Sequence, residues 1–160
     1  MKTILKAAFI LTLCLGSFAA QAQEEKRGEV PFRTDSGLIN AEYYLATGKY
    51  MQALDVLNGV LLRHPLNADA YTYRGYAYEQ MNELKRAKEN YDRALQIDPT
   101  HLGANKYTGA MLIRAGKLDR AMEQMQAIRL ICGATGCAEL DELESDMNLY
   151  KKEKKAKKKD

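Results

Sequence analysis

The sequence predicts an all-α fold: a solenoid of three helical hairpins followed by a C-terminal capping helix. The main evidence is a repeat of 34 residues, because segments 34–67, 68–101 and 102–135 align with one another without gaps. Small residues and turn residues recur at matching places in the three segments. One hairpin cannot bury its apolar face alone, so we expect neighbouring hairpins to stack around a shared core.

The composition is that of an ordinary globular chain. Of the 160 residues, 46% are hydrophobic and 28% are charged, which excludes collagen-like, wholly disordered and polytopic membrane classes. The formal net charge is +3, of which the first 22 residues contribute +2 and the last ten +5. Residues 23–150 therefore carry −4. A mildly acidic body lacks the basic face that binding to nucleic acid requires, so we expect no nucleic-acid partner.

Residues 1–22 have the features of a secretory signal peptide. Lys2 and Lys6 form a basic start, residues 7–18 form a short apolar core, and residues 20–22 (Ala-Gln-Ala) offer a small-x-small cleavage site. The apolar run is much shorter than the ~20 residues of a membrane-spanning helix. We therefore expect cleavage after Ala22 and no transmembrane span in the mature chain.

Cys14 does not fit a lipoprotein signal, because Leu13 stands where a small residue is required and Cys14 lies inside the apolar core. We expect it to be removed with the signal. Residues 23–33 are predicted to be a flexible leader between the signal and the first repeat.

The middle segment indicates how one hairpin packs. Gly75 and Ala87 are small enough to let two antiparallel helices approach closely, and Tyr78 and Tyr91 would fill the space beside them. Equivalent small residues lie in the outer segments at Ala41, Ala53, Gly109 and Ala121.

Turn and cap residues mark the ends of the predicted helices. Residues that tolerate a positive φ fall between the two helices of each hairpin, at Gly48, Asn82 and Gly116. Pro65 and Pro99 end the second helices of the first two hairpins. Asn67 and Thr100 are predicted to be the N-caps of the helices that follow.

These residues and their spacing resemble the tetratricopeptide repeat (TPR). The signature places of that repeat are matched in the middle segment by Tyr71, Gly75, Tyr78, Ala87, Tyr91, Ala94 and Pro99. Arg74 stands where the family usually has an aliphatic residue, and Gly37 and Asn105 stand where it has a large aromatic one. The resemblance implies a right-handed TPR solenoid over residues 34–135 that acts in protein–protein interaction.

Residues 136–150 are predicted to form the capping helix. Its apolar stripe is made by Leu140, Leu143, Met147 and Tyr150. Acidic residues crowd its start and lysines follow its end, which suits the helix dipole. Residues 151–160 are predicted to be a disordered Lys-rich tail, either a solubilising extension or an anchor to an anionic envelope surface.

Cys132 and Cys137 are the cysteines that remain after the signal is removed. In an oxidising compartment, two cysteines this close most simply form a disulfide, which would fix how the capping helix leaves the last repeat. Thiol–disulfide chemistry is an alternative, although four residues separate the pair where thioredoxin-like motifs have two. A zinc site would need His64 and His101 as well, and we expect no metal and no cofactor.

The family's groove, lined by the first helix of each repeat, is the expected binding site. The resemblance assigns to it Leu38, Glu42, Leu45, Thr72, Tyr76, Glu79, Gln80, Lys106, Ala110, Ile113 and Arg114. This set predicts a groove for an extended peptide or a helix whose acidic group lies toward Lys106 and Arg114. Glu42 and Glu79 would repel a C-terminal carboxylate, so we do not expect the family's carboxylate clamp.

No catalytic motif accompanies this groove, so the chain is not expected to be an enzyme. The sequence predicts a module for protein–protein interaction, an adaptor or assembly factor that is secreted across the inner membrane into the bacterial periplasm. The alternatives are a thiol–disulfide active protein and a protein anchored to anionic envelope polymer through its tail.

Overall fold

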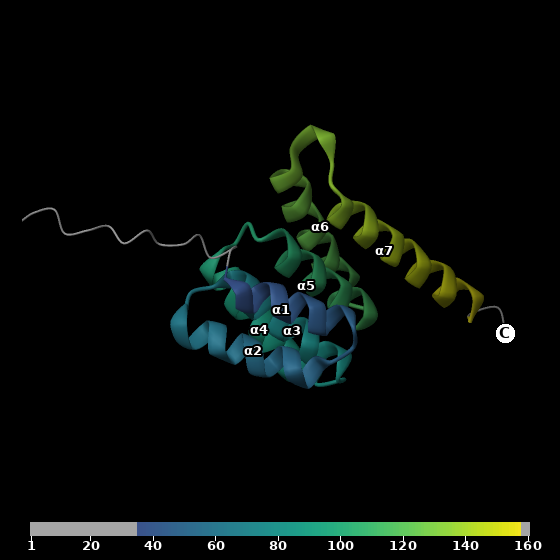
Figure 1. The fold of residues 1–160 in the computed structure, drawn as a ribbon. Helices are drawn as coiled ribbons and strands as arrows, with labels where there is room; N and C mark the ends of the chain where they lie inside the picture. Colours follow the sequence, from purple (N-terminus) through teal and green to yellow (C-terminus); the bar gives the residue numbers. More distant parts are fainter. Residues whose placement is uncertain (1–34, 158–160) are drawn as a thin grey trace, which may run out of the picture. The chain divides into compact units, whose positions relative to one another are not determined.

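The computed structural model describes residues 35–157, which form seven α-helices and a short 3₁₀ helix and include no strand (Figure 1). The predicted signal and leader lie outside the described residues. Three helix pairs come first: α1 (Ser36–Ala46) with α2 (Tyr50–Arg63), α3 (Ala68–Gln80) with α4 (Leu84–Ile97), and α5 (Leu102–Arg114) with α6 (Leu118–Cys132). The 3₁₀ helix η2 (Gly133–Thr135) then leads to α7 (Ala138–Ala156). The predicted all-α fold of three helical hairpins and a C-terminal helix is confirmed over these residues.

The turn inside each pair repeats the same backbone geometry. Gly48, Asn82 and Gly116 have φ values of 72°, 61° and 71°, as their residue types predict. The next residue donates its N–H to a carbonyl five residues back in all three turns: Lys49 to Tyr44, Glu83 to Tyr78 and Lys117 to Leu112. This is the hydrogen bond of a Schellman C-cap, and it makes the three hairpins equivalent.

Side chains cap the first helix of each pair. Asp35 accepts a hydrogen bond from the N–H of Gly37 (2.7 Å), and Asn67 accepts one from Ala70 (2.8 Å). The prediction for Asn67 is confirmed.

The predicted N-cap at Thr100 is wrong. The side chain of Thr100 is held by Asp98, whose Oδ1 accepts from its hydroxyl (2.7 Å) and its N–H (2.9 Å). His101 caps α5 instead, because its Nδ1 accepts the N–H of Ala104 (3.1 Å).

The middle hairpin packs as its small residues predict. A Cβ built on Gly75 would lie 2.5 Å from the ring of Tyr91, which is only 1% exposed. Ala87 and Ala94 are fully buried on the same helix as Tyr91. The ring of Tyr91 thus occupies the space that the missing side chain of Gly75 leaves.

The helix α7 packs against α5 and α6. Its predicted apolar stripe is confirmed, because Leu140, Leu143 and Met147 are buried and Tyr150 is half-buried. Leu143 lies over Gly109, where a Cβ would come within 2.5 Å of Leu143 Cδ2. The third repeat therefore closes its core with a side chain of α7.

The predicted disorder of the tail is wrong for its first part, because α7 continues to Ala156. Once the packed turns have nucleated the helix, adding further residues costs little free energy, and lysine has a favourable helix propensity. Residues 151–157 are all exposed, and residues 158–160 lie outside the described part.

Candidate partner-binding face

The first helices of neighbouring repeats lie side by side, since α3 contacts both α1 and α5, and α5 contacts α7. This packing buries four of the eleven predicted groove residues: Leu38, Thr72, Ala110 and Ile113, which are 1–8% exposed. Leu45 is half-buried against the core of the first two repeats. The assignment to an open groove is therefore wrong for the four buried positions, while Leu45 stays partly exposed.

Lys106 and Arg114 do not form the predicted free basic end. The ammonium of Lys106 lies 2.8 Å from Oε2 of Glu142 on α7, and Arg114 forms an ion pair with Glu79 on α3. Burial lowers the pKa of Lys106, but the hydrogen bond and charge of Glu142 outweigh this effect and raise it above its usual value. Both cations already have acidic partners within the chain.

Glu79 is structural, because its side chain is only 8% exposed. Besides the ion pair with Arg114, its Oε2 accepts the hydroxyl hydrogen bond of buried Tyr91 (2.7 Å). Glu42 and Gln80 stay exposed and Tyr76 stays half-exposed. The surface that α1 and α3 present is therefore smaller than predicted.

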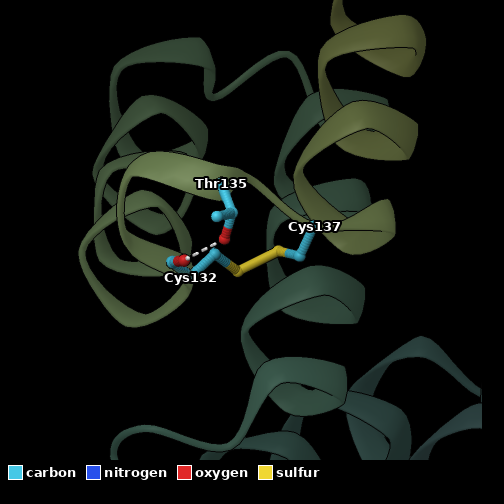
Figure 2. Close-up of a disulfide and its surroundings, with 3 residues drawn as sticks. All are labelled: Cys132, Thr135 and Cys137. Carbon is cyan, nitrogen blue, oxygen red and sulfur yellow. Dashed lines mark hydrogen bonds between the residues drawn. A yellow bond between two sulfur atoms is a disulfide. The ribbon is translucent and has the colours of Figure 1, made fainter.

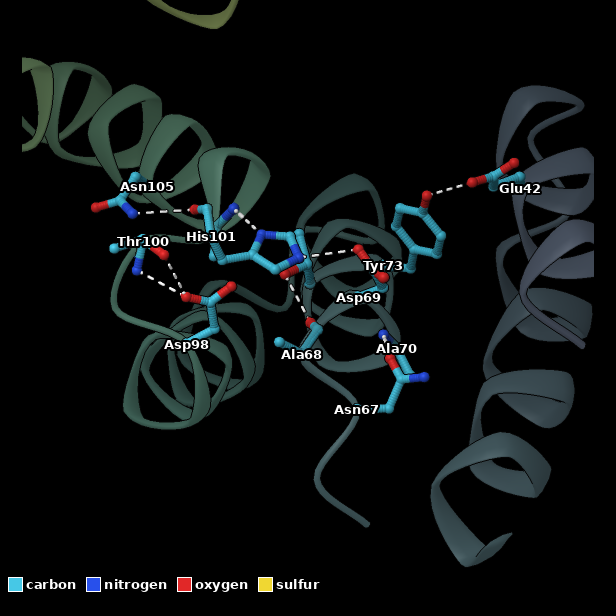
Figure 3. A network of polar contacts seen from close by, with 12 residues as sticks. Glu42, Asn67, Ala68, Asp69, Ala70, Tyr73, Asp98, Thr100, His101 and Asn105 are labelled. Atoms are coloured by element: carbon cyan, nitrogen blue, oxygen red, sulfur yellow. Dashed lines mark hydrogen bonds and ion pairs between the residues drawn. The ribbon is translucent and has the colours of Figure 1, made fainter. Parts of the chain in front are cut away.

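Tyrosines dominate that surface, and two of them were missing from the predicted groove. The ring of Tyr76 lies 5.2 Å from that of Tyr107, and Tyr107 stacks on Tyr91 at 5.7 Å. Tyr73 donates its hydroxyl hydrogen bond to Glu42 of α1 (Figure 3). Tyr73 and Tyr107 are 34 residues apart, a signal in the repeat that could have found them.

Burial raises the pKa of Tyr73, and the hydrogen bond and negative charge of Glu42 raise it further. Burial also raises the pKa of Tyr107, against the charge of Lys106, whose ammonium lies 4.7 Å from the centre of the Tyr107 ring. Both phenols are therefore neutral at physiological pH and present an aromatic face with a hydroxyl.

A pocket of about 510 Å³ opens beside these rings, at the N-terminal ends of α3 and α5. Its lining includes Asp69, Tyr73, Lys106, Tyr107 and Glu139. His101 also lines the pocket and bridges two repeats, with Nε2 2.9 Å from Oδ1 of Asp69 (Figure 3). We call Tyr73, Tyr76 and Tyr107, with this pocket, the tyrosine face.

Cys132 and Cys137 form a disulfide in the structure, with their Cα atoms 5.8 Å apart (Figure 2). Gly133 and Gly136 adopt positive φ values between them, which lets the chain reverse in a few residues. Arg129 and Glu144 form an ion pair of 2.8 Å between α6 and α7. The disulfide and the ion pair thus link the last repeat to α7.

Neither a metal cluster nor a membrane span was found in the described residues. No group of three His, Cys, Asp or Glu side chains within 35–157 lies close enough to hold a metal ion. None of the helices in that range is long and apolar enough to cross a membrane.

The sequence model of the tetratricopeptide repeat matches residues 68–101, which are α3, α4 and the loop that follows. The chain therefore contains a tetratricopeptide repeat. Over 103 residues it is 27% identical to the small glutamine-rich tetratricopeptide repeat-containing protein 2 of Saccharomyces cerevisiae, an alignment that covers 64% of this chain and 28% of that protein. The chain thus spans less than a third of this relative.

Two solved structures share the fold of this tetratricopeptide repeat protein. MamA (residues 41 to end) of Desulfovibrio magneticus RS-1 matches with a TM-score of 0.55 and 25% identity over 60% of this chain and 54% of that one. The TPR2B domain of yeast Sti1, solved in complex with pHsp70, matches with a TM-score of 0.65 and 16% identity over 74% of this chain and 95% of that one.

In the outer repeats of this tetratricopeptide repeat protein, Gly37 and Asn105 replace the large aromatic residue of the family pattern, and the structure accommodates both. Asn105 is buried, and its amide donates to the carbonyls of Pro99 (3.1 Å) and His101 (3.0 Å). Gly37 lies so close to Val60 that a Cβ would come within 2.6 Å of it. The buried amide of Asn105 thus has hydrogen-bond acceptors, and the small size of Gly37 lets Val60 pack against it.

Proposed function

We propose that this tetratricopeptide repeat protein holds an extended peptide or a helical segment of a partner protein on the tyrosine face. The observation that carries the proposal is the row of half-buried rings Tyr73, Tyr76 and Tyr107 beside the pocket of about 510 Å³. Tyrosine gives a large contact area with little loss of side-chain entropy, and its hydroxyl can pair with a partner's backbone. The fold itself is that of an interaction module.

The charges on this face narrow the chemistry of the partner. Lys106 and Arg114 are paired within the chain, while Asp69, Asp98 and Glu139 line the pocket. An acidic group on the partner would compete with Glu142 for Lys106 and with Glu79 for Arg114. We therefore propose a neutral or basic segment that places an apolar or aromatic side chain against the tyrosine rings.

The related fold in yeast Sti1 supports this kind of function, because it was solved in complex with pHsp70. Its identity of 16% is too low to transfer that partner to this chain. The likeness supports a module that binds part of another protein. We place the binding site on the tyrosine face because of the residues described above.

We also infer that the protein is exported to the periplasm of a bacterium, where it acts as an adaptor or assembly factor. The basic start, apolar core and Ala-Gln-Ala site of residues 1–22 support this proposal. A disulfide between Cys132 and Cys137 fits an oxidising compartment. Amino-terminal sequencing of the purified protein tests it: a chain that starts at Gln23 is expected, and one that retains residues 1–22 would contradict export with cleavage.

Site-specific photo-crosslinking tests the binding face. A benzophenone amino acid is placed at Tyr76 on the tyrosine face and, as a control, at Met122, which is 49% exposed on α6. We expect irradiation in an envelope extract to give a discrete crosslinked product from position 76 that is absent from position 122. The same product from both positions, or only from position 122, would contradict the proposed face.

A further inference from the structure

The face of α7 opposite its buried side carries an exposed stripe with a heptad spacing. The buried side is made by Leu140, Leu143 and Met147, which pack on α5 and α6. Opposite them, six exposed residues follow one another at steps of four and three: Ala138, Glu142, Ser145, Leu149, Lys152 and Ala156. Alternating steps of three and four place side chains along one seam, as in a coiled coil.

The charges of this stripe are complementary to those of a second copy of α7 that runs in the opposite direction. If a second α7 lies antiparallel with its centre at Met147, Ala138 faces Ala156 and Ser145 faces Leu149. Glu142 then faces Lys152, so each acidic position of the stripe meets a basic one. In a parallel arrangement the same residues would meet their own copies, acid against acid and lysine against lysine.

One flank of the stripe repeats this complementarity. Asp141 and Lys155 are both exposed and would lie opposite each other in the antiparallel pair. On the other flank Asp146 would face Asp146 of the second copy, and Glu139 would approach Glu153. The like charges on this flank weaken the pairing, so the charge pattern favours the antiparallel arrangement but limits its strength.

We propose that α7 binds α7 of a second copy of this chain as a two-fold antiparallel pair. Leu149, which is 55% exposed, supplies the apolar centre, and Glu142, Asp141, Lys152 and Lys155 supply the orientation. A single helix face is a small interface, so the dimer is weak and salt-sensitive. The proposal does not depend on the proposed function, but the two surfaces share residues: Glu139 on the flank also lines the pocket of the tyrosine face, and Glu142 also pairs with Lys106.

Sedimentation equilibrium at low ionic strength, over a range of protein concentrations, tests the pair with two charge-reversed variants. In Asp141→Lys/Glu142→Lys, lysines would face Lys155 and Lys152 of the second copy. In Lys152→Glu/Lys155→Glu, glutamates would face Glu142 and Asp141. We expect each variant alone to self-associate at least about tenfold more weakly than the wild type, because four attractive charge pairs become repulsive.

An equimolar mixture of the two variants restores every one of these pairs, and we expect it to associate at least as well as the wild type. Asp146→Asn removes a like-charge contact and should tighten the wild-type dimer. A helical circular dichroism spectrum checks that each variant is folded. A wild type that stays monomeric, single variants that still dimerise, or a mixture that stays monomeric would each overturn the proposal. So would binding of the wild type to phosphatidylglycerol vesicles without self-association, which would assign the stripe to a membrane.

Discussion

His101 and Asp69 join the first helices of neighbouring repeats, with Nε2 of the imidazole 2.9 Å from Oδ1 of the carboxylate. The other ring nitrogen of His101 accepts the N–H of Ala104 and so caps α5. Because Nδ1 accepts, the proton of a neutral ring lies on Nε2 and is donated to Asp69. One side chain thus starts a helix and fixes its register against the previous repeat.

Because His101 caps α5, substitutions of His101 should lower the free energy of unfolding to different extents. We expect His101→Ala to lower the free energy of unfolding by about 1 kcal/mol, because the N–H of Ala104 loses its acceptor. His101→Asn keeps a capping oxygen, as Asn67 provides one repeat earlier, and should lose less. Urea unfolding followed by circular dichroism measures both. Equal losses for the two variants would show that the cap does not stabilise α5.

Two glycines inside helices should respond to alanine in opposite directions. At Gly75 a Cβ would lie 2.5 Å from the ring of Tyr91, which is buried and has no room to move. We expect Gly75→Ala to destabilise the protein by about 1–3 kcal/mol through overpacking. At Gly59 the nearest contact is the flexible end of Arg63, 3.6 Å away.

Gly59→Ala is the matched control and should stabilise the protein by up to about 1 kcal/mol, since alanine is the better helix former. Thermal unfolding of both variants beside the wild type checks the pair. If Gly75→Ala is neutral or stabilising, the close approach of α3 and α4 at Tyr91 is wrong.

The link between Cys132 and Cys137 should stabilise the end of the solenoid. The loop that it closes is short, so its entropic contribution is about 2 kcal/mol. We expect a reducing agent to lower the thermal midpoint of the wild type and to leave Cys132→Ser/Cys137→Ser unchanged. A wild type that is insensitive to reductant would mean that the bond does not hold α7. Insulin-reducing activity that depends on these cysteines would favour the thiol–disulfide alternative.

Asp35 should make the free energy of unfolding depend on pH in the acidic range. Burial raises the pKa of its carboxyl, but the hydrogen bond from Gly37 and the ion pair with Arg63 outweigh this effect, so the pKa lies below the ordinary value of 3.8. Such a group adds stability above its unfolded pKa and loses it as the pH falls through the lower, folded pKa.

Asp35→Asn keeps a capping oxygen but does not titrate. We therefore expect the variant to lose less stability than the wild type when the pH is lowered from neutral to below 3.8. Urea unfolding at a series of pH values measures the difference. Parallel curves for the two proteins would contradict the role of Asp35.

The repeat unit could be predicted from the sequence because its signals are local. A turn residue with a positive φ, a small residue and the ring that packs on it all lie within one hairpin, as at Asn82, Gly75 and Tyr91. The period also predicts where helices begin, since α2, α4 and α6 start at Tyr50, Leu84 and Leu118. Thr100 was mistaken for a cap although His101 lies 34 residues after Asn67.

The binding face was harder to predict because it depends on contacts between repeats. Thr72 and Ile113 lie on the first helices of their repeats, as predicted for the groove. Both are buried because their side of the helix faces a neighbouring helix. Lys106 and Arg114 are neutralised by partners 36 and 35 residues away, Glu142 and Glu79. A pattern within one repeat does not contain such pairs. The last turns of α7 are not predicted because repulsion between lysines opposes a helix there, whereas in the structure the helix propagates from its packed turns to Ala156.

The affinity of a captured partner for variants at Tyr76 tests the central claim most directly. Tyr76 is half-exposed on α3 beside Tyr107, so Tyr76→Ala removes contact area from the tyrosine face without emptying the core. We expect Tyr76→Ala to weaken binding about tenfold or more, Tyr76→Phe to restore most of it, and Met122→Ala on α6 to leave it unchanged. Binding that is unaffected by Tyr76→Ala but reduced by Met122→Ala would contradict the account.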